Sequence, residues 1–453
     1  MTILLQHIVT IMVVTILSAL LSVLGPGAEA RAQSIPSPAS LETAPPGTRS
    51  SRGWRRATYP TIHRYRAPQG PTTDLSYIDN STCPPVHGID SSIKAFLTHY
   101  SIAGATLGVM RNDSLLYVKS YGYSDRDKKI PMEPSNIMRV ASVSKLLTSI
   151  GIMKLQEEGH LSISECPLAP GGILGDEPYC KAITDQRFYD VTIEHLLRHE
   201  GGFSSKDYDP MFTDSGVSAL ERNALVAHCL GMPMGFDPGT SNDYSNIGYY
   251  LLGLIIEKIS GEKYADWMQK NIFAPMNCHK FRMAGSYLCD RLPGEVKYYD
   301  YPRAPLDIDY HANGRRVPRC YGGNNVAGLE GAGSWAASVP ELCRITAGID
   351  IDPGVEDILG EKSIRQMTTC AADTSYALGW ISADRVGIWT RTGSFAGTNA
   401  IIRNYSWDGD CWVLVTNSCT PLGSRLARKT SSLFMEMRRK YLWDLPKKDL
   451  FHR

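Results

Sequence analysis

The sequence lacks an excess of charge of either sign. Its 47 Lys and Arg residues nearly balance 46 Asp and Glu residues, which gives a formal net charge of +1 at pH 7. Bulk electrostatics therefore does not indicate nucleic acid or an anionic membrane surface as a partner. No glycine-rich phosphate-binding loop or nucleotide motif stands out, so we expect no cofactor.

The eleven cysteines contain no Cys-x-x-Cys pair, so the sequence does not support a zinc ribbon or a thioredoxin-type motif. In an oxidising compartment several cysteines would pair and, because their number is odd, one would stay free. Cys166 and Cys180 flank a loop rich in Pro and Gly and are the candidates for a local disulfide. The alternative is that the cysteines are buried free thiols that act as small apolar side chains.

The one long apolar run lies at the N-terminus, from Ile8 to Leu24, and no Lys or Arg precedes it. Small residues follow, and Ala28-Glu29-Ala30 and Ala30-Arg31-Ala32 both suit a signal peptidase. We therefore expect residues 1–32 to be a signal peptide and the protein to be exported, periplasmic or extracellular, with no membrane span after cleavage. The alternative is an uncleaved anchor, because the run is close to the shortest length that spans a bilayer.

Downstream of the leader, residues 33–86 are rich in Pro, Ser, Thr and Arg and predict a spacer. Residues 87–445 predict one α+β domain. Its sheet would come from both ends of the chain, about 87–130 and 331–445, with a mostly helical part at about 131–330 inserted between them. The stretch 265–330 is irregular, and we expect loops over a site there rather than core.

The elements follow from apolar periodicity and turn residues. Helices are predicted at 89–100, 191–199, 247–260 and 424–441. Strands are predicted at 103–110, 115–123, 377–381, 386–390, 398–404 and 411–417. Arg111-Asn112-Asp113 is typical of the turn in a hairpin between the first two strands.

One serine–lysine pair begins an apolar helical run that Gly159 can end. Ser142 and Lys145 are three residues apart, so on a helix they share a face and Lys145 can reach the Ser142 hydroxyl. If Ser142 opens the helix, the helix dipole favours negative charge at its oxygen. A partly desolvated lysine can then act as the base that activates the serine. The alternative is an exposed pair on an ordinary helix, because Ser91/Lys94 and Ser260/Lys263 have the same spacing.

A second possible site is formed by His195 and His199, which are four residues apart on a predicted helix. A zinc hydrolase would normally place a Glu after the first His, and this sequence has Leu there. Structural histidines are therefore the preferred interpretation.

Three motifs, in order along the chain, resemble those of the penicillin-recognising serine hydrolases. The branch is that of the class C β-lactamases, D-alanyl-D-alanine carboxypeptidases and related esterases. The first motif is Ser142-Val143-Ser144-Lys145, the second is Tyr244-Ser245-Asn246, and the third is Arg391-Thr392-Gly393 followed by Ser394. The resemblance extends from about Gly88 to Tyr441. It implies a β-lactamase/transpeptidase-like fold with an antiparallel sheet, and a serine hydrolase that works through an acyl-enzyme.

The resemblance also implies roles for the motif residues. Ser142 would attack the substrate carbonyl, and Lys145 and Tyr244 would share the proton transfers. Asn246 would hold the Lys145 ammonium or a substrate amide, although it could instead be the N-cap of the following helix. The backbone N–H groups of Ser142 and Ser394 would form the oxyanion hole.

The third motif departs from the family, which usually has Lys or His where this sequence has Arg391. Arg keeps the positive charge and adds a planar fork that suits a carboxylate. One hypothesis is therefore that Arg391, followed by Thr392 and Gly393, binds a substrate carboxylate. The alternative is a structural ion pair at the end of the strand.

The motifs leave several functions open. A small-molecule or peptide-like substrate is expected, but carboxypeptidase, esterase and β-lactamase activities use the same residues. A non-enzymatic scaffold or interaction protein on the same fold is the alternative from another class. The sequence does not give the oligomeric state.

Overall fold

The computed structural model describes residues 75–204, 209–212, 214–370, 376–384 and 386–451. The predicted signal peptide and most of the predicted spacer lie outside these ranges. Residues 75–86 belong to the predicted spacer, yet Leu75, Ile78, Cys83 and Val86 are buried in the core. This part of the chain therefore packs onto the folded domain.

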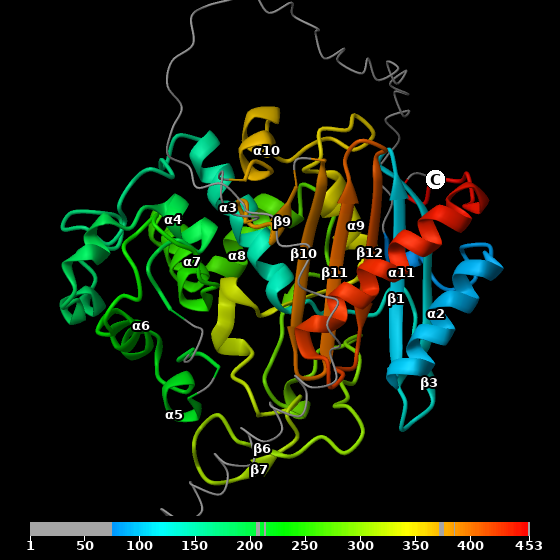
Figure 1. Ribbon diagram of the computed structural model, residues 1–453, viewed down its shortest axis with the longest axis horizontal. Helices are drawn as coiled ribbons and strands as arrows, with labels where there is room; N and C mark the ends of the chain where they lie inside the picture. The colour runs from blue at the N-terminus through cyan, green and yellow to red at the C-terminus, as the bar shows by residue number, and fades with distance from the viewer. Residues whose placement is uncertain (1–74, 205–208, 213, 371–375, 385, 452–453) are drawn as a thin grey trace, which may run out of the picture. The chain divides into compact units, whose positions relative to one another are not determined.

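The main sheet has seven antiparallel strands in the order β3-β2-β1-β12-β11-β10-β9, so strands from both ends of the chain meet at the β1–β12 pair (Figure 1). The strands are β1 (Gly104–Arg111), β2 (Ser114–Asp125), β3 (Ile130–Pro131), β9 (Ser382–Ala383), β10 (Ile388–Phe395), β11 (Thr398–Tyr405) and β12 (Asp410–Thr416). This is the predicted α+β sheet.

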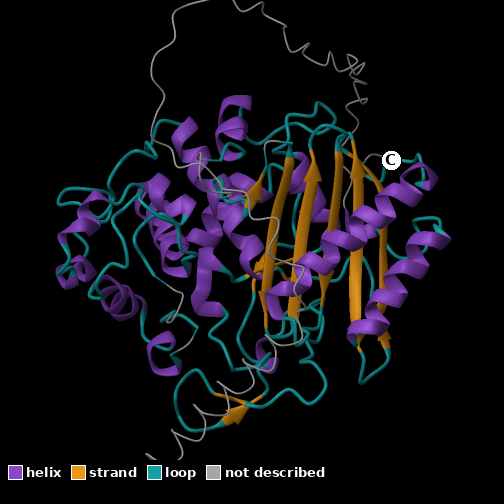
Figure 2. Ribbon diagram, viewed as in Figure 1, coloured by secondary structure: helices purple, strands orange, loops and turns teal. Residues whose placement is uncertain are grey.

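Helices cover both faces of the sheet (Figures 1 and 2). The helices α2 (His87–Tyr100) and α11 (Leu426–Tyr441) pack together on one face, and α9 (Val339–Ala347) packs against β1 and β12 on the other. Every residue of β12, and every residue of β1 except the last, is buried or nearly so. Burial on both faces explains why these strands are apolar almost throughout instead of alternating.

The inserted part of the chain is mostly helical, as predicted. Its helices are α3 (Ser144–Glu157), α4 (Ile193–Arg198), α5 (Ser215–Ser218), α6 (Arg222–Leu230), α7 (Asn246–Ser260) and α8 (Tyr264–Met268), and α10 (Glu361–Met367) follows α9. It also contains a small sheet, β4 (Met138–Arg139), β8 (Trp335–Ala337) and β5 (Arg282–Met283), and the hairpin β6 (Asp307–Ile308) with β7 (Arg316–Val317). None of the helices in the described ranges is long and apolar enough to cross a membrane.

Two predictions about this architecture are wrong. Residues 265–330 are not only loops, because Trp267, Phe273 and Phe281 are buried and the two Phe rings stack at 4.1 Å. The strand predicted at 377–381 is a turn, because Gly379 has a φ of 89°, which a strand does not allow.

The predicted Cys166–Cys180 disulfide is also absent, since all eleven cysteines are free thiols. The Cys180 thiol instead donates to the Leu174 carbonyl (3.2 Å). Eight of the cysteines are buried, as expected for thiols that act as small apolar side chains.

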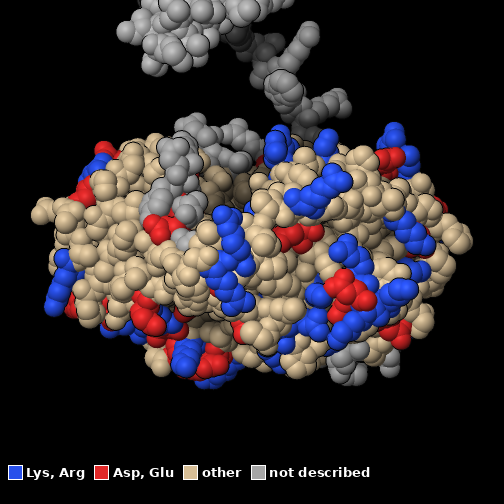
Figure 3. All heavy atoms as spheres, turned by 90° about the horizontal axis from the view of Figure 1, so that it is seen from below, with Lys and Arg blue, Asp and Glu red and all other residues tan. Residues whose placement is uncertain are grey.

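Charged side chains of both signs lie side by side on the face shown in Figure 3. This mixture agrees with the formal net charge of +1. A buried acidic cluster lies elsewhere, where the β1–β2 turn meets the loop after α9. Asp113 is 3% exposed, and burial followed by the charges of Asp350 and Asp352 raises the pKa of its carboxyl. Burial also raises the pKa of Asp350.

Asn at position 113 should stabilise the fold at neutral pH, because it resembles the protonated carboxyl that the buried site favours. A carboxyl whose pKa is raised by folding stabilises the protein below its unfolded pKa of about 4 and loses that contribution as the pH rises. The Tm advantage of Asp113→Asn over the parent should therefore grow by roughly 2–5 °C between pH 5 and pH 8. The exposed Asp176→Asn is the control, and an equal advantage at both pH values would contradict this account.

Strand β10 lies unusually close to the turn that carries Ser142. A Cβ atom on Gly393 would lie 2.1 Å from the Val140 carbonyl oxygen and 3.0 Å from the Ser142 amide nitrogen. Both are backbone atoms, so a larger residue must push the two segments apart.

Gly393→Ala should therefore lower the Tm and slow the reaction of Ser142 with a fluorophosphonate by on the order of 100-fold, because the serine predicted to act as the nucleophile is displaced. The matched control is Gly253→Ala on α7, where the nearest atom would be 3.7 Å away. Labelling of Gly393→Ala at the parental rate would show that the close approach is not needed.

Candidate active site

Ser142 lies in a 3-10 turn, η2 (Ala141–Val143), between β4 and α3. The helix-dipole argument required Ser142 to open the helix, but α3 begins two residues later, at Ser144. Ala141 has a φ of 48°, which is uncommon for a residue with a side chain. Ala141 and Val143 are fully buried, whereas Ser142 is partly exposed. The turn therefore leaves Ser142 accessible between buried neighbours.

Lys145 lies one turn further and is fully buried. Its ammonium donates to the Ala332 carbonyl (2.6 Å), to Asn246 Oδ1 (2.7 Å) and, more weakly, to Ser142 Oγ (3.4 Å). Burial lowers the pKa of Lys145 to about 8. The side chain is thus held in place and can lose its proton near neutral pH.

Tyr244, in the segment before α7, and Asn246, the first residue of α7, reach Ser142 and Lys145, so both side chains point into the same cluster. The Tyr244 hydroxyl donates to Ser142 Oγ (2.5 Å). Asn246 is not the N-cap of α7, because the Ser245 side chain accepts from the Gly248 amide and fills that role. Asn246 is therefore left to bind Lys145.

The Tyr244 hydroxyl is more acidic than an ordinary phenol. Burial alone would raise its pKa, but the positive charges of Lys145 and Arg391 outweigh burial and lower it. Burial has the opposite outcome at Tyr249, also near Lys145, and raises the pKa of that phenol to about 12. Of these two tyrosines, only Tyr244 has its pKa shifted toward the phenolate.

Arg391 is fully buried behind Ser142. Its Nε donates to the Ser142 carbonyl (2.7 Å) and its Nη1 to the Gly379 carbonyl (3.1 Å). The sequence predicted either a substrate carboxylate or a structural ion pair as the partner of Arg391. Within the described residues, the fully buried side chain donates instead to these two backbone carbonyls. Arg391 thus fixes the backbone of Ser142 and adds a positive charge to the site.

The rest of the third motif follows Arg391 along β10. Gly393 lies against the Ser142 amide, so the β10 backbone comes close to Ser142. Thr392 and Ser394 line a small cavity together with Leu426 and Thr430 of α11. The side chains of Thr392 and Ser394 therefore lie in this cavity and not beside the Ser142 hydroxyl. An oxyanion role for Ser394 would depend on its backbone N–H group.

The two histidines of the zinc alternative have separate partners. His195 Nδ1 accepts from the Thr192 amide (3.2 Å), and His199 Nδ1 accepts from the Ser245 amide (3.0 Å). The His199 ring packs 4.6 Å from the Tyr244 ring, and burial keeps its pKa well below the usual value. In the described part of the chain, no three His, Cys, Asp or Glu side chains are placed to hold a metal ion. His199 thus supports the Tyr244–Ser245 backbone.

One charged residue of the site was not predicted from the sequence. Asp209 Oδ2 accepts from Asn246 Nδ2 (2.6 Å) and Oδ1 accepts from the Met211 amide (3.0 Å). Because the carboxylate takes the NH₂ end of Asn246, the carbonyl end is left for Lys145. Asp209 belongs to no motif, and only the chain's path brings it next to Asn246.

Comparison with known proteins agrees with this geometry. The Beta-lactamase family matches residues 89–433. Penicillin-binding protein 4* of Bacillus subtilis is 27% identical over 303 residues, which are 64% of this chain and 63% of that protein. The chain therefore spans less than two thirds of that relative.

Two solved structures show the same fold. D-amino acid amidase from Ochrobactrum anthropi, complexed with L-phenylalanine amide, superposes with a TM-score of 0.61 at 18% identity, covering 78% of this chain and 99% of that one. D-alanine carboxypeptidase AmpC from Burkholderia cenocepacia gives a TM-score of 0.58 at 17% identity, covering 77% and 97%. The predicted β-lactamase/transpeptidase-like fold is confirmed, and the chain belongs to the Beta-lactamase family, the penicillin-recognising serine hydrolases that its three motifs resemble.

Proposed function

We propose that the protein is an exported serine hydrolase that cleaves an amide, peptide or ester bond through an acyl-enzyme on Ser142. The observation that supports this most strongly is the 2.5 Å contact between the Tyr244 hydroxyl and Ser142 Oγ, next to two buried cations. A nucleophile, a base of lowered pKa and the groups that orient the base are thus in one place.

In the acylation step, Tyr244 in its phenolate form takes the proton of the Ser142 hydroxyl. Ser142 Oγ then bonds to the substrate carbonyl carbon, and the carbonyl electrons move to the oxygen. When the tetrahedral intermediate collapses, the bond to the leaving amine or alcohol breaks and Tyr244 returns the proton to that group. Lys145, held by Asn246 and the Ala332 carbonyl, stabilises the phenolate throughout.

In the deacylation step, water replaces the leaving group. Tyr244 takes a proton from the water, whose oxygen attacks the acyl carbon, and returns the proton to Ser142 Oγ as the ester bond breaks. The backbone N–H groups of Ser142 and Ser394 would bind the oxyanion in both steps. One such donor contributes on the order of 10²–10³ in rate.

The similar structures favour an amide or peptide bond, since they are an amidase and a carboxypeptidase. Export rests on the predicted signal peptide, residues 1–32, which lies outside the described residues.

Tyr244→Phe should slow fluorophosphonate labelling of Ser142 by at least roughly 100-fold, because the phenol that accepts the serine proton is gone. Labelling is followed by intact mass, with Ser142→Ala expected to gain no adduct. The matched control is Tyr249→Phe, which removes a buried hydroxyl that donates to the Leu197 carbonyl (2.7 Å) but does not contact Ser142. It should label within a few-fold of the parent.

Absence of labelling in the parent protein would reject the hydrolase and favour the scaffold alternative. Equal loss in Tyr244→Phe and Tyr249→Phe would point to a packing defect and would argue against Tyr244 as the base.

The pKa of Tyr244 is lowered by the charge of Lys145 and then by that of Arg391. Arg391→Gln should therefore move the acidic limb of the pH–labelling profile to higher pH by about one unit, because the second of these charges is removed. The direction follows from the mechanism: the phenolate is the active form, so a higher pKa requires a higher pH.

Arg391→Lys is the control, because it keeps the positive charge. The acidic limb of its pH–labelling profile should stay closer to that of the parent. An unchanged limb in Arg391→Gln, or a shift to lower pH, would contradict the electrostatic role.

A further inference from the structure

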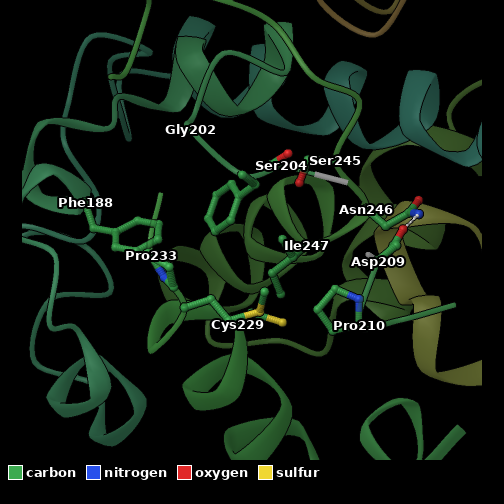
Figure 4. Close-up of a pocket in the computed structure, with 12 residues that line it drawn as sticks. Phe188, Gly202, Ser204, Asp209, Pro210, Cys229, Pro233, Ser245, Asn246 and Ile247 are labelled. Carbon is green, nitrogen blue, oxygen red and sulfur yellow. Dashed lines mark hydrogen bonds between the residues drawn. The ribbon is translucent and has the colours of Figure 1, made fainter. Parts of the chain in front are cut away.

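The ammonium of Lys145 has two close acceptors, Asn246 Oδ1 (2.7 Å) and the Ala332 carbonyl (2.6 Å). Asp209 orients the first, since the Asn246 side chain is turned toward that carboxylate and donates to it (2.6 Å), as Figure 4 shows. The second acceptor lies outside the three motifs, at the end of the 3-10 segment η7 (Ala327–Ala332). What orients this carbonyl therefore also helps to hold the lysine.

The backbone two residues before this carbonyl is strained. Glu330 has a φ of 40° and a ψ of −121°, a region that residues with a Cβ atom rarely adopt and that glycine adopts readily. Such a conformation costs free energy and persists only where neighbouring contacts hold it. The contacts around Glu330 therefore help to decide where the Ala332 carbonyl lies.

Helices α3 and α7 hold the inner side of this segment. Thr148 Oγ1 in α3 donates to the Gly331 carbonyl (2.7 Å). A Cβ atom on Gly331 would lie only 3.0 Å from Thr148 Oγ1 and 3.2 Å from the Tyr249 carbonyl oxygen in α7. Gly331 thus has little room to move toward the two helices.

An ion pair holds the outer side of the segment. Arg222 in α6 donates from Nη2 to Glu330 Oε1 (2.9 Å), and its Nη1 pairs with Glu257 in α7. These side chains lie at the wall of an open cavity of about 690 Å³, yet the Glu330 side chain is only 21% exposed. Burial raises the pKa of Glu330, and the charge of Arg222 acts to lower it. Arg222 therefore attaches the strained residue to both α6 and α7.

We propose that Arg222 and Glu330 are positioning residues for Lys145. Their ion pair keeps the Glu330 backbone in its strained conformation, which directs the Ala332 carbonyl to the ammonium. The inference rests on the proposed hydrolase function, in which Lys145 stabilises the phenolate of Tyr244. Without the pair the backbone relaxes, the carbonyl moves away from Lys145, and the less stable phenolate forms only at higher pH.

The test compares Glu330→Ala with Glu330→Gly in the full-length protein. Both substitutions remove the same carboxylate, and therefore the same charge and ion pair, but only alanine keeps the Cβ atom that makes this conformation costly. Fluorophosphonate labelling of Ser142 is followed by intact mass as a function of pH, and the Tm of each variant is measured. The control is Lys258→Gln, which breaks the exposed ion pair between α7 and Glu177 (2.6 Å).

Glu330→Ala should label at least roughly tenfold more slowly than Glu330→Gly, because a small displacement of the lysine slows the reaction strongly. The acidic limb of its pH–labelling profile should lie at higher pH. Arg222→Gln should slow labelling of the parent by a similar factor. Added to Glu330→Gly, it should slow labelling by less than roughly threefold, because the two residues act through one contact. Lys258→Gln should label at the parental rate.

Three results would overturn the inference. One is an equal labelling rate in Glu330→Ala and Glu330→Gly, since the strain would then have no role. The second is an equal effect of Arg222→Gln with and without Glu330→Gly, since Arg222 would then act independently of Glu330. The third is an Arg222→Gln variant that has a lower Tm but labels at the parental rate, which would make the ion pair purely structural. Each leaves the proposed function standing, whereas a parent that does not label would reject both.

Discussion

Two cationic side chains are enclosed in the protein interior next to one phenol, and this arrangement determines the chemistry of the site. Lys145 and Arg391 are both fully buried, where unbalanced positive charge is costly. Ionisation of Tyr244 relieves that cost, which is why its pKa falls although burial alone would raise it. Burial, and after it these same two charges, keep the pKa of His199 low. Asp209, through Asn246, supplies the opposing negative charge.

The fold holds this charge cluster from three separate parts of the chain. The turn η2 and helix α3 carry Ser142 and Lys145, the start of α7 carries Asn246, and β10 carries Arg391. In the antiparallel β10–β11 pair, Arg391 lies opposite Ile402, and this register fixes the position of Arg391 along the sheet. The contact between Gly393 and η2 then sets how close the β10 backbone comes to Ser142. A shift of one residue in that register would turn Arg391 to the other face of the sheet.

Local patterns predicted the elements that are regular and the residues that belong to motifs. The 89–100 helix and the first two strands were found within a few residues, because their apolar periodicity and the Asn112-Asp113 turn are local signals. Both turn residues have positive φ (46° and 59°), as such hairpins require. The strand predicted at 377–381 failed because the positive φ of Gly379 ends it.

The parts of the site that were not predicted depend on contacts distant in sequence. The Lys145–Asn246 bond joins residues 101 positions apart, but each stands in a motif. The Ala332 carbonyl and the Asp209 carboxylate stand in none, so only the tertiary structure reveals them. The position of Arg391 was predicted, but the direction of its side chain was not. Its charge could bind either a substrate carboxylate or a group in the protein interior. The contact with the Ser142 carbonyl in η2 directs the side chain into the interior.

The most direct measurement is an NMR titration of the protein with ¹³Cζ-labelled tyrosine, with Tyr244 assigned from the signal missing in Tyr244→Phe. The account predicts that Tyr244 titrates below the ordinary tyrosine pKa of about 10, while buried tyrosines such as Tyr249 titrate above it. A Tyr244 signal that titrates at or above pH 10 would contradict the central claim that the two buried cations prepare it as the base.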